Sequence, residues 1–185
     1  MVDEVIADVE GRMKKAIEHL RHDLAVVRTG RASPALLERV QVDYFGTPTP
    51  VNQLATVSVP EARVLTIQPW DRSSLPAIER AILKSDLGIT PNSDGAVIRL
   101  VLPQPTQERR KELVRQLHKR TEEARVAIRN ARRDGVEKLK QTEKDKRISA
   151  DESKRGQDRL QKVTDKMIGE ADEVARAKEH EIMTV

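Results

Sequence analysis

Four arginines form the group of side chains with the clearest capacity for chemistry. They are Arg125, Arg129, Arg132 and Arg133. Arg129 follows Arg125 by four positions and precedes Arg132 and Arg133 by three and four, so a helix would carry them on one side. A guanidinium presents a planar fork of donors that matches the oxygens of a phosphate. The cluster therefore predicts a face that binds a polyanion, and the alternative interpretation is the solvated face of a coiled coil.

The surplus of positive charge is confined to the segment that carries these arginines. Residues 106–147 hold 15 basic and 8 acidic side chains, a net charge of +7. The other segments are close to neutral. Residues 1–29 hold 5 basic and 6 acidic side chains, residues 30–105 hold 7 of each, and residues 148–185 hold 7 basic and 9 acidic. A helix face that served solubility alone would mix both signs, so this distribution favours a polyanion partner.

The type of polyanion follows from where the aromatic residues lie. The only aromatic residues are Tyr44, Phe45 and Trp70, all far along the chain from the arginine cluster. A face without aromatic side chains cannot stack unpaired bases. We therefore expect it to hold the phosphates and grooves of folded RNA through charge and shape.

Signatures of catalysis and of metal binding are missing from the sequence. There is no cysteine, so thiolate nucleophiles, thiolate metal sites and disulfides are all excluded. His19 and His22 have the spacing of a ligand pair, but no third ligand accompanies them, and we interpret them as surface residues. No phosphate-binding glycine loop or serine elbow occurs. The sequence predicts a protein that is not an enzyme and that has no cofactor and no metal.

Two different compositions divide the chain. All nine prolines lie between Pro34 and Pro105, and residues 31–105 hold 14 charged residues against 50 in the remaining 110 positions. Proline is excluded from helix interiors, so the flanks read as helical and the middle as an insert. We predict one helical, RNA-binding domain made of residues 1–29 and 106–185, with an inserted domain over residues 30–105.

Three apolar stripes with steps of three and four run through the flanks, as expected for helices that each bury one face. The stripes are Ile6, Val9, Met13, Ala16, Leu20, Leu24 and Val27; then Leu113, Leu117, Thr121, Ala124, Ile128, Ala131, Gly135 and Leu139; then Leu160, Val163, Met167, Ala171, Val174 and Ile182. Ser149 and Glu152 have the spacing of a capping box at the start of the last helix. These features predict an elongated three-helix bundle.

The insert has the pattern of a small α+β module with about five strands and one helix. Expected strands include Val40–Tyr44, Thr56–Val59, Arg63–Ile67 and Val97–Leu102, each close to a turn signal or a proline. The expected helix runs over Ser74–Leu87. It would turn Ile78, Ile82 and Leu83 inward and end with Gly88 as its C-terminal cap.

The sequence also bears on location and assembly. The N-terminus lacks the basic start and apolar core of a signal peptide, and no apolar run approaches ~20 residues. We therefore expect a cytoplasmic protein with no membrane contact, and we expect it to be a monomer.

Several segments together resemble the ribosome recycling factor family. The first, Val27-Arg28-Thr29-Gly30-Arg31-Ala32-Ser33-Pro34, is similar to the signature of that family. Further segments follow in the family's order over essentially the whole chain. They are Tyr44–Pro48, Gln68–Asp71, Ser85–Ile89, Glu108–Leu113, Val126–Arg133 and Glu181–Met183.

The resemblance implies a fold and a function. The implied fold is a three-helix bundle with a hinged β/α/β domain, in an L shape similar to transfer RNA. Members of the family act with elongation factor G after termination to split the ribosome, which frees messenger RNA and transfer RNA. The bundle would lie on RNA of the large ribosomal subunit, and GTP hydrolysis would belong to the partner.

The resemblance also implies specific site residues. The RNA-contacting arginines of the family match Arg110, Arg129 and Arg132 here. The hinge would lie at the two chain crossings, Thr29-Gly30-Arg31 and Gln104-Pro105-Thr106. This sequence departs from the family at the second crossing, where Pro105 stands in place of the usual leucine. Because proline fixes φ, the departure puts the freedom of the hinge in question.

Two competing functions fit parts of the pattern. A structural coiled-coil adaptor would not need clustered arginines and would be insensitive to salt. A general RNA chaperone would bind many RNAs alike, without dependence on elongation factor G.

Overall fold

The computed structural model describes residues 1–185, and its internal contacts divide the chain into two units. The first, called the helical unit below, comprises Met1–Val27 and Gln107–Thr184. The second, called the insert unit, comprises Arg28–Thr106 together with Val185. The α+β fold class expected from the sequence is confirmed. One unit consists of three long helices, and the other contains small β-sheets and one α-helix.

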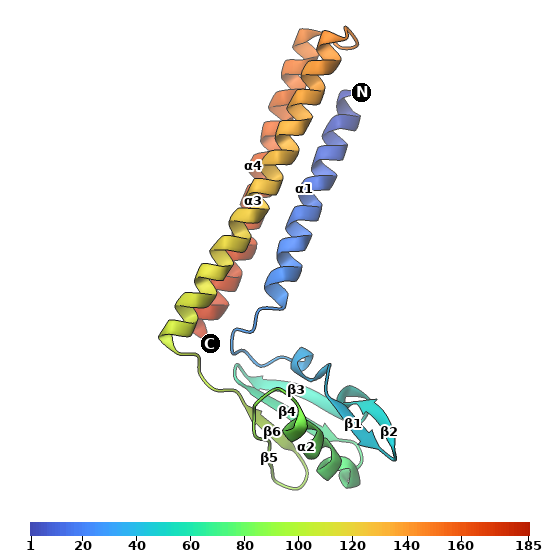
Figure 1. Ribbon diagram of the computed structural model, residues 1–185, viewed down its shortest axis with the longest axis vertical. Helices are drawn as coiled ribbons and strands as arrows, with labels where there is room; N and C mark the ends of the chain where they lie inside the picture. Colours follow the sequence, from blue (N-terminus) through green and yellow to red (C-terminus); the bar gives the residue numbers. More distant parts are fainter. The chain divides into compact units, whose positions relative to one another are not determined.

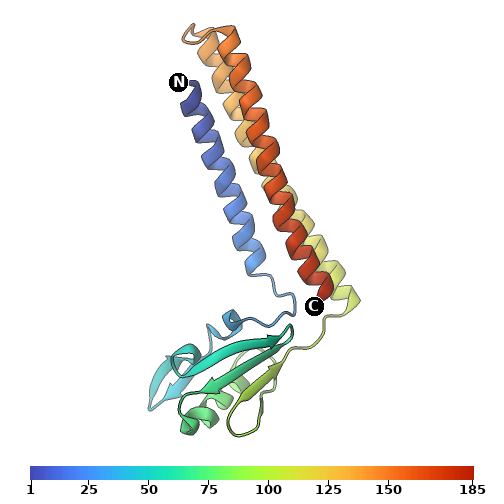
Figure 2. The same cartoon turned by 180° about the vertical axis from the view of Figure 1, so that it is seen from behind.

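Three long helices make up the helical unit. They are α1 (Val2–Ala25), α3 (Gln107–Lys144) and α4 (Ala150–Thr184), and each packs against the other two (Figure 1). Seen from behind, the helices still lie side by side, and the start of α1 is at the end of the bundle where α3 turns into α4 (Figure 2). An ion pair of 2.7 Å between Asp3 and Arg159 joins α1 to α4 at that end.

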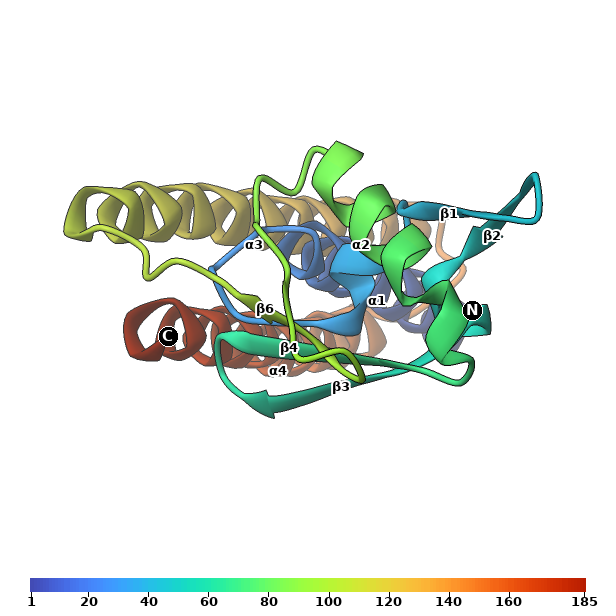
Figure 3. The ribbon, with the colours of Figure 1, turned by 90° about the horizontal axis from the view of Figure 1, so that it is seen from below.

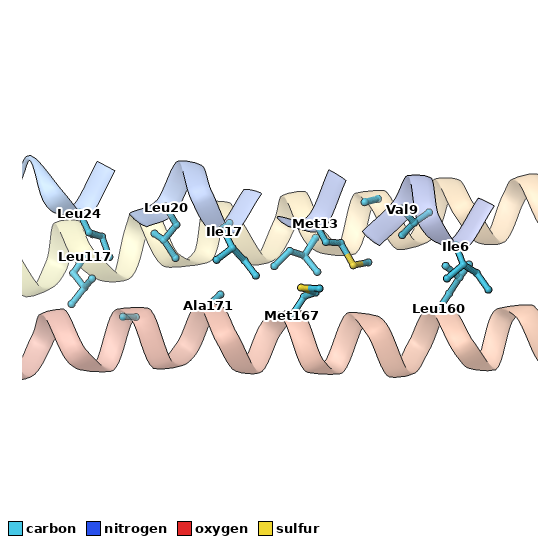
Figure 4. Close-up of a cluster of buried hydrophobic side chains, with 14 of the residues drawn as sticks. Ile6, Val9, Met13, Ile17, Leu20, Leu24, Leu117, Leu160, Met167 and Ala171 are labelled. Atoms are coloured by element: carbon cyan, nitrogen blue, oxygen red, sulfur yellow. The ribbon is translucent and has the colours of Figure 1, made fainter. Parts of the chain in front are cut away.

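The core of the helical unit lies along the predicted stripes. All eight residues of the α3 stripe are buried, so that prediction is confirmed in full. On α1 Ile17 is buried, and the predicted Ala16 and Val27 are only partly buried beside the core, Val27 beyond the end of the helix. On α4 Thr164 and Ala175 are buried in the core between the helices, and the predicted Val163 and Val174 are only partly buried beside them. Figure 4 shows apolar side chains of α1 meeting those of α4 along this core.

A capping box begins α4, as predicted. The backbone N–H of Ser149 donates to the Glu152 carboxylate at 2.9 Å, and the Glu152 N–H donates to Oγ of Ser149 at 3.0 Å. This reciprocal pair satisfies amides that would otherwise lack a partner in the first turn. Lys146, with a φ of 58°, turns the chain between α3 and α4.

The insert unit contains two antiparallel sheets. In one, β1 (Gln41–Tyr44) pairs with β2 (Thr47–Pro50). The other has the order β3-β4-β6-β5. Its strands are β3 (Ala55–Glu61), β4 (Val64–Pro69), β5 (Asn92–Ser93) and β6 (Ile98–Val101). Short 3-10 helices occupy Pro34–Leu37, Val51–Gln53 and Arg72–Ser74.

The core of the insert unit lies between α2 (Leu75–Lys84) and the larger sheet. Ile78 and Ile82 of α2 are buried together with Leu65 and Ile67 of β4 and with Ile98 of β6. These strand residues share one face because they alternate along β4 and are paired across β4 and β6. The view in Figure 3 has α2 lying across the strands.

Three expectations for the insert unit were wrong in detail. The helix ends at Lys84, where the Ser85 hydroxyl donates to the carbonyl of Ile82, so Gly88 is not its cap. Leu83 is 59% exposed and lies outside the core. There are six strands, because the sequence analysis missed β2, which contains two prolines, and the two-residue β5.

Candidate nucleic-acid interface

The structure places all five arginines predicted to bind RNA on α3, as their spacing requires. Arg129 and Arg133 are exposed, whereas Arg110, Arg125 and Arg132 are partly buried. A rise of about 1.5 Å per residue puts Arg110 roughly 30 Å along the axis from Arg132. The clustered four therefore form one patch, which we call the arginine face (Arg125, Arg129, Arg132 and Arg133), and Arg110 lies at the far end of the same helix.

Arg132 is held by a neutral partner. Its Nη1 donates a hydrogen bond of 2.8 Å to Oε1 of Gln161 on α4. The amide of Gln161 is itself oriented, because its Nε2 donates to Asp165 at 2.8 Å. An amide oxygen restricts the rotamers of the guanidinium without cancelling its charge. Arg132 is thus positioned while its positive charge stays uncompensated by this partner.

Arg125 has a different environment. Its Nε and Nη2 both donate to Oδ1 of Asp172 on α4, at 2.9 and 2.6 Å, and its Nη1 lies 3.0 Å from Glu122. The hydrogen bond to Asp172 is the main cause that raises the pKa of Arg125 above its ordinary value, with Glu122 adding to it against the effect of burial. Two carboxylates compensate this charge, so Arg125 fastens α3 to α4.

The other two arginines of the face differ in how far they are neutralised. Nη1 of Arg129 lies 3.3 Å from Glu122, the same carboxylate that contacts Arg125. Arg133 is exposed and forms neither an ion pair nor a side-chain hydrogen bond. Glu122 is divided between two guanidiniums, of which only Arg125 also has Asp172, so Arg129 is only partly neutralised. The uncompensated charge of the face is therefore concentrated on Arg132 and Arg133, with a part on Arg129.

Sequence reasoning missed three residues that shape this face. Gln161 and Asp172 lie on α4 and reach the arginines only because the two helices pack in one particular register. Val126, which is 45% exposed, places an apolar side chain one turn before Arg129 and Asn130. A helical wheel of α3 reveals Val126 beside the arginines, but nothing in the sequence reveals which α4 residues lie opposite them.

The predicted hinge residues lie at the two ends of the Arg28–Thr106 segment. Gly30 has a φ of +86°, a backbone conformation that other residues resist. A Cβ atom added to Gly30 would lie 2.8 Å from Cγ of Pro105, so the structure brings the two chain crossings into contact at these residues. Thr29 is buried, whereas Arg31, Gln104 and Thr106 are exposed.

The structure contains no group of three or more histidine, cysteine or acidic side chains that could hold a metal ion. None of its helices has the length and apolarity needed to cross a membrane.

Comparison with known proteins adds three matches. The family model described as "Ribosome recycling factor" matches residues 20–183. The ribosome-recycling factor of Syntrophomonas wolfei subsp. wolfei is 60% identical over 185 residues, which is 100% of both chains. That of Heliobacterium modesticaldum is also 60% identical over 100% of both chains.

Two solved structures are similar over the same extent. A solution structure of a ribosome recycling factor matches with a TM-score of 0.72 at 48% identity, covering 100% of this chain and 98% of that one. The T. thermophilus factor, in a structure with E. coli elongation factor G bound to the E. coli post-termination complex, matches with a TM-score of 0.63 at 47% identity. Coverage is 98% of both chains.

Proposed function

The chain belongs to the ribosome recycling factor family, and from that premise we propose that it binds the large ribosomal subunit and splits the post-termination complex together with elongation factor G and GTP. As a member of this family it is a translation factor and not an enzyme. The proposal assigns GTP hydrolysis to the partner. The chain itself supplies the helical unit, which binds RNA, and the insert unit, which elongation factor G contacts and displaces.

The observation that carries the RNA-binding part is the support of Arg132 by a neutral amide. A guanidinium whose rotamer is fixed but whose charge is not compensated loses little conformational entropy when it meets a phosphate. Arg133 adds an uncompensated charge one position further on, and Arg129 adds another that is partly balanced. We assign direct phosphate contacts to these three arginines, and to Arg110 further along α3. To Arg125 we assign the role of holding α3 and α4 in register.

The part played by the partner is supported by the T. thermophilus relative, whose structure includes elongation factor G on a post-termination complex. We propose that the helical unit stays on ribosomal RNA while elongation factor G moves the insert unit. Motion would occur at Thr29-Gly30-Arg31 and Gln104-Pro105-Thr106. The positive φ of Gly30 supports this assignment, because such a residue accommodates backbone changes that a residue with a Cβ atom resists.

A subunit-splitting assay tests the proposal. Light scattering of post-termination ribosomes should fall when this chain, elongation factor G and GTP are all present, and should stay constant when any of the three is left out. Arg132→Glu should weaken binding to large subunits by ~1–3 kcal/mol, as expected for a lost charge-assisted contact, while the helical content stays unchanged.

Arg155→Glu is the matched control for that variant. Its side chain is 72% exposed on α4 and pairs only with Asp151, one turn away. It carries the same change of charge outside the arginine face, so it should retain nearly full affinity. Binding by the wild-type chain should also weaken steeply with salt, and Arg132→Ala should make that dependence shallower by about one unit. An adaptor would show no salt dependence, and a general RNA chaperone would not need elongation factor G.

A further inference from the structure

The turn that joins β1 to β2 has a conformation that does not suit its first residue. Phe45 and Gly46 connect the paired residues Tyr44 and Thr47, and they have φ values of +51° and +80°. Two positive values define a type I′ turn, in which asparagine or glycine is preferred at the first position. A bulky aromatic residue is strained there. The hairpin would fold more easily with a different residue at position 45.

Burial of the ring does not offset this strain. Phe45 is 88% exposed, the most exposed of the large apolar side chains in the chain. Its aromatic contact is an edge-to-face arrangement with Tyr44, at 4.6 Å between ring centroids and 72° between planes. Asp43 fixes the turn by accepting a hydrogen bond of 2.9 Å from the Gly46 N–H. The hairpin therefore presents an apolar ring to solvent, and the turn between β1 and β2 lies at an extremity of the insert unit in Figure 3.

The surroundings of the ring indicate what it could bind. Asp43 is the only charged residue from Gln41 to Pro50, so the hairpin offers no cation to a phosphate. Pro48 and Pro50 lack amide protons, which prevents the outer edge of β2 from pairing fully with a strand of another protein. A ring can stack on a base, but sites for single strands combine such rings with positive charge along the backbone, so neither RNA nor an added strand suits this hairpin. An exposed aromatic ring on a tight turn, with no neighbouring positive charge, suits an apolar pocket in a protein.

We propose that Phe45 is an aromatic anchor that inserts into an apolar pocket of a protein partner on the post-termination ribosome. The inference rests on the proposed function and adds a second, protein-directed contact to the RNA-directed arginine face. The strain at position 45 is then explained, because the residue is kept for the ring that it presents and not for the turn that it forms.

Replacement of Phe45 by asparagine separates stability from function. Asn tolerates positive φ, so Phe45→Asn should raise the midpoint of thermal unfolding of the insert unit by roughly 3–6 °C. The same variant should lower the rate of subunit splitting by at least about tenfold, as expected for the loss of an anchoring aromatic residue. Its affinity for isolated large subunits should change little, because the arginine face is intact.

Leu83→Asn is the matched control, because it removes another large exposed apolar side chain of the insert unit. It should leave splitting within about twofold of the wild-type rate. Splitting by Phe45→Asn at the wild-type rate would overturn the inference, and so would an equal loss in Leu83→Asn. Failure of the wild-type chain to split ribosomes would instead overturn the proposed function on which the inference rests.

Photo-crosslinking identifies the class of the partner directly. A benzophenone analogue of phenylalanine placed at position 45, with purified ribosomes, elongation factor G and a GTP analogue, should give an adduct that protease destroys and ribonuclease leaves intact. The same analogue at position 83 provides the background. An adduct to ribosomal RNA, or none above that background, would overturn the inference.

Discussion

Nη1 of Arg132 on α3 donates a 2.8 Å hydrogen bond to Oε1 of Gln161 on α4. This contact between two helices fixes a cation with an uncharged acceptor. The charge of the residue at position 161 therefore controls how much positive charge the arginine face presents.

We predict that Gln161→Glu weakens binding to large ribosomal subunits although Gln161 itself is not assigned an RNA contact. The new carboxylate would pair with Arg132 and compete with phosphate, which should lower the affinity by about 1 kcal/mol. Gln161→Met removes the acceptor without adding charge and should have a smaller effect. Equilibrium binding to isolated large subunits at two salt concentrations measures both. Equal affinities for Gln161→Glu and the wild type would show that Arg132 does not meet phosphate.

Arg125 should behave as a structural residue. Arg125→Ala removes the contacts with Asp172 and Glu122 and should lower the free energy of unfolding of the helical unit by about 1 kcal/mol, a value discounted for partial exposure of both partners. Once the fold is populated, RNA affinity should fall less than for Arg132→Ala. A double-mutant cycle with Asp172→Asn, followed by circular dichroism in urea, isolates the pair. A larger loss of binding in Arg125→Ala than in Arg132→Ala would contradict this assignment.

The comparison of Arg125 with Arg132 also shows where sequence-based prediction ends. The stripe on α3 could be predicted without error because its steps of three and four admit one face. After Met13, however, steps of three and four lead to Ala16 and Ile17 respectively, and only packing selects the larger side chain. The arginine cluster was visible as a local pattern. Its division into compensated and uncompensated charges depends on α4, whose register against α3 is a long-range property.

The β2 strand was missed for a related reason. Pro48 and Pro50 argue against a strand when the sequence is considered alone. The register of β1 and β2 is set by the tight turn at Phe45-Gly46, and a strand whose outer edge is unpaired tolerates missing amide protons. The strand therefore exists because of its turn and its neighbour, and not because of its own composition.

The insert unit should lose stability in acid partly through Asp94. Its Oδ1 accepts hydrogen bonds from the N–H groups of Val97, at 2.9 Å, and Ala96, at 3.0 Å. Hydrogen bonds from these two amides, that of Val97 first, lower the pKa of Asp94 below its ordinary value of 3.8. A carboxyl whose pKa is lowered in the folded state stabilises that state above 3.8, and this contribution disappears as the pH falls through the folded pKa.

The test replaces Asp94 by asparagine, which keeps the oxygen acceptor but does not titrate. Fluorescence of Trp70, the only tryptophan, reports unfolding of the insert unit, since the ring belongs to that unit and its Nε1 donates to Thr56. Below pH 4 the unfolding midpoint of the wild type should fall more steeply with pH than that of Asp94→Asn. Parallel pH profiles would exclude Asp94 as a source of acid sensitivity.

Pro105 should restrict the proposed hinge. Its ring lies against Gly30, so the two chain crossings are held in contact at these residues. Pro105→Leu frees φ at one crossing and should broaden the distribution of distances between spin labels placed one in each unit. Affinity for isolated large subunits should stay nearly constant, because the arginine face is untouched. An unchanged distance distribution would show that Pro105 does not limit the hinge.

Gly135 should be required by the packing of the three helices. A Cβ atom at this position would lie 2.6 Å from Cγ2 of Val9 on α1 and 3.1 Å from Cδ1 of Leu160 on α4. Alanine is the better helix former by about 1 kcal/mol, yet the β-branched Val9 cannot rotate away from the added methyl group. We expect Gly135→Ala to destabilise the helical unit by about 1–3 kcal/mol, because overpacking outweighs helix propensity.

Three further variants test this explanation. A Cβ atom at Gly169, an exposed glycine of α4, would meet nothing within 4 Å. Gly169→Ala should therefore stabilise the bundle by up to about 1 kcal/mol through propensity alone. Val9→Ala should make room for the new methyl group, so the double variant with Gly135→Ala should be more stable than the sum of the two single effects predicts. Urea denaturation followed by circular dichroism measures all four proteins. Strict additivity of the two effects would contradict the explanation, and so would stabilisation by Gly135→Ala alone. Either result would show that Val9 and Leu160 leave room for a methyl group at position 135.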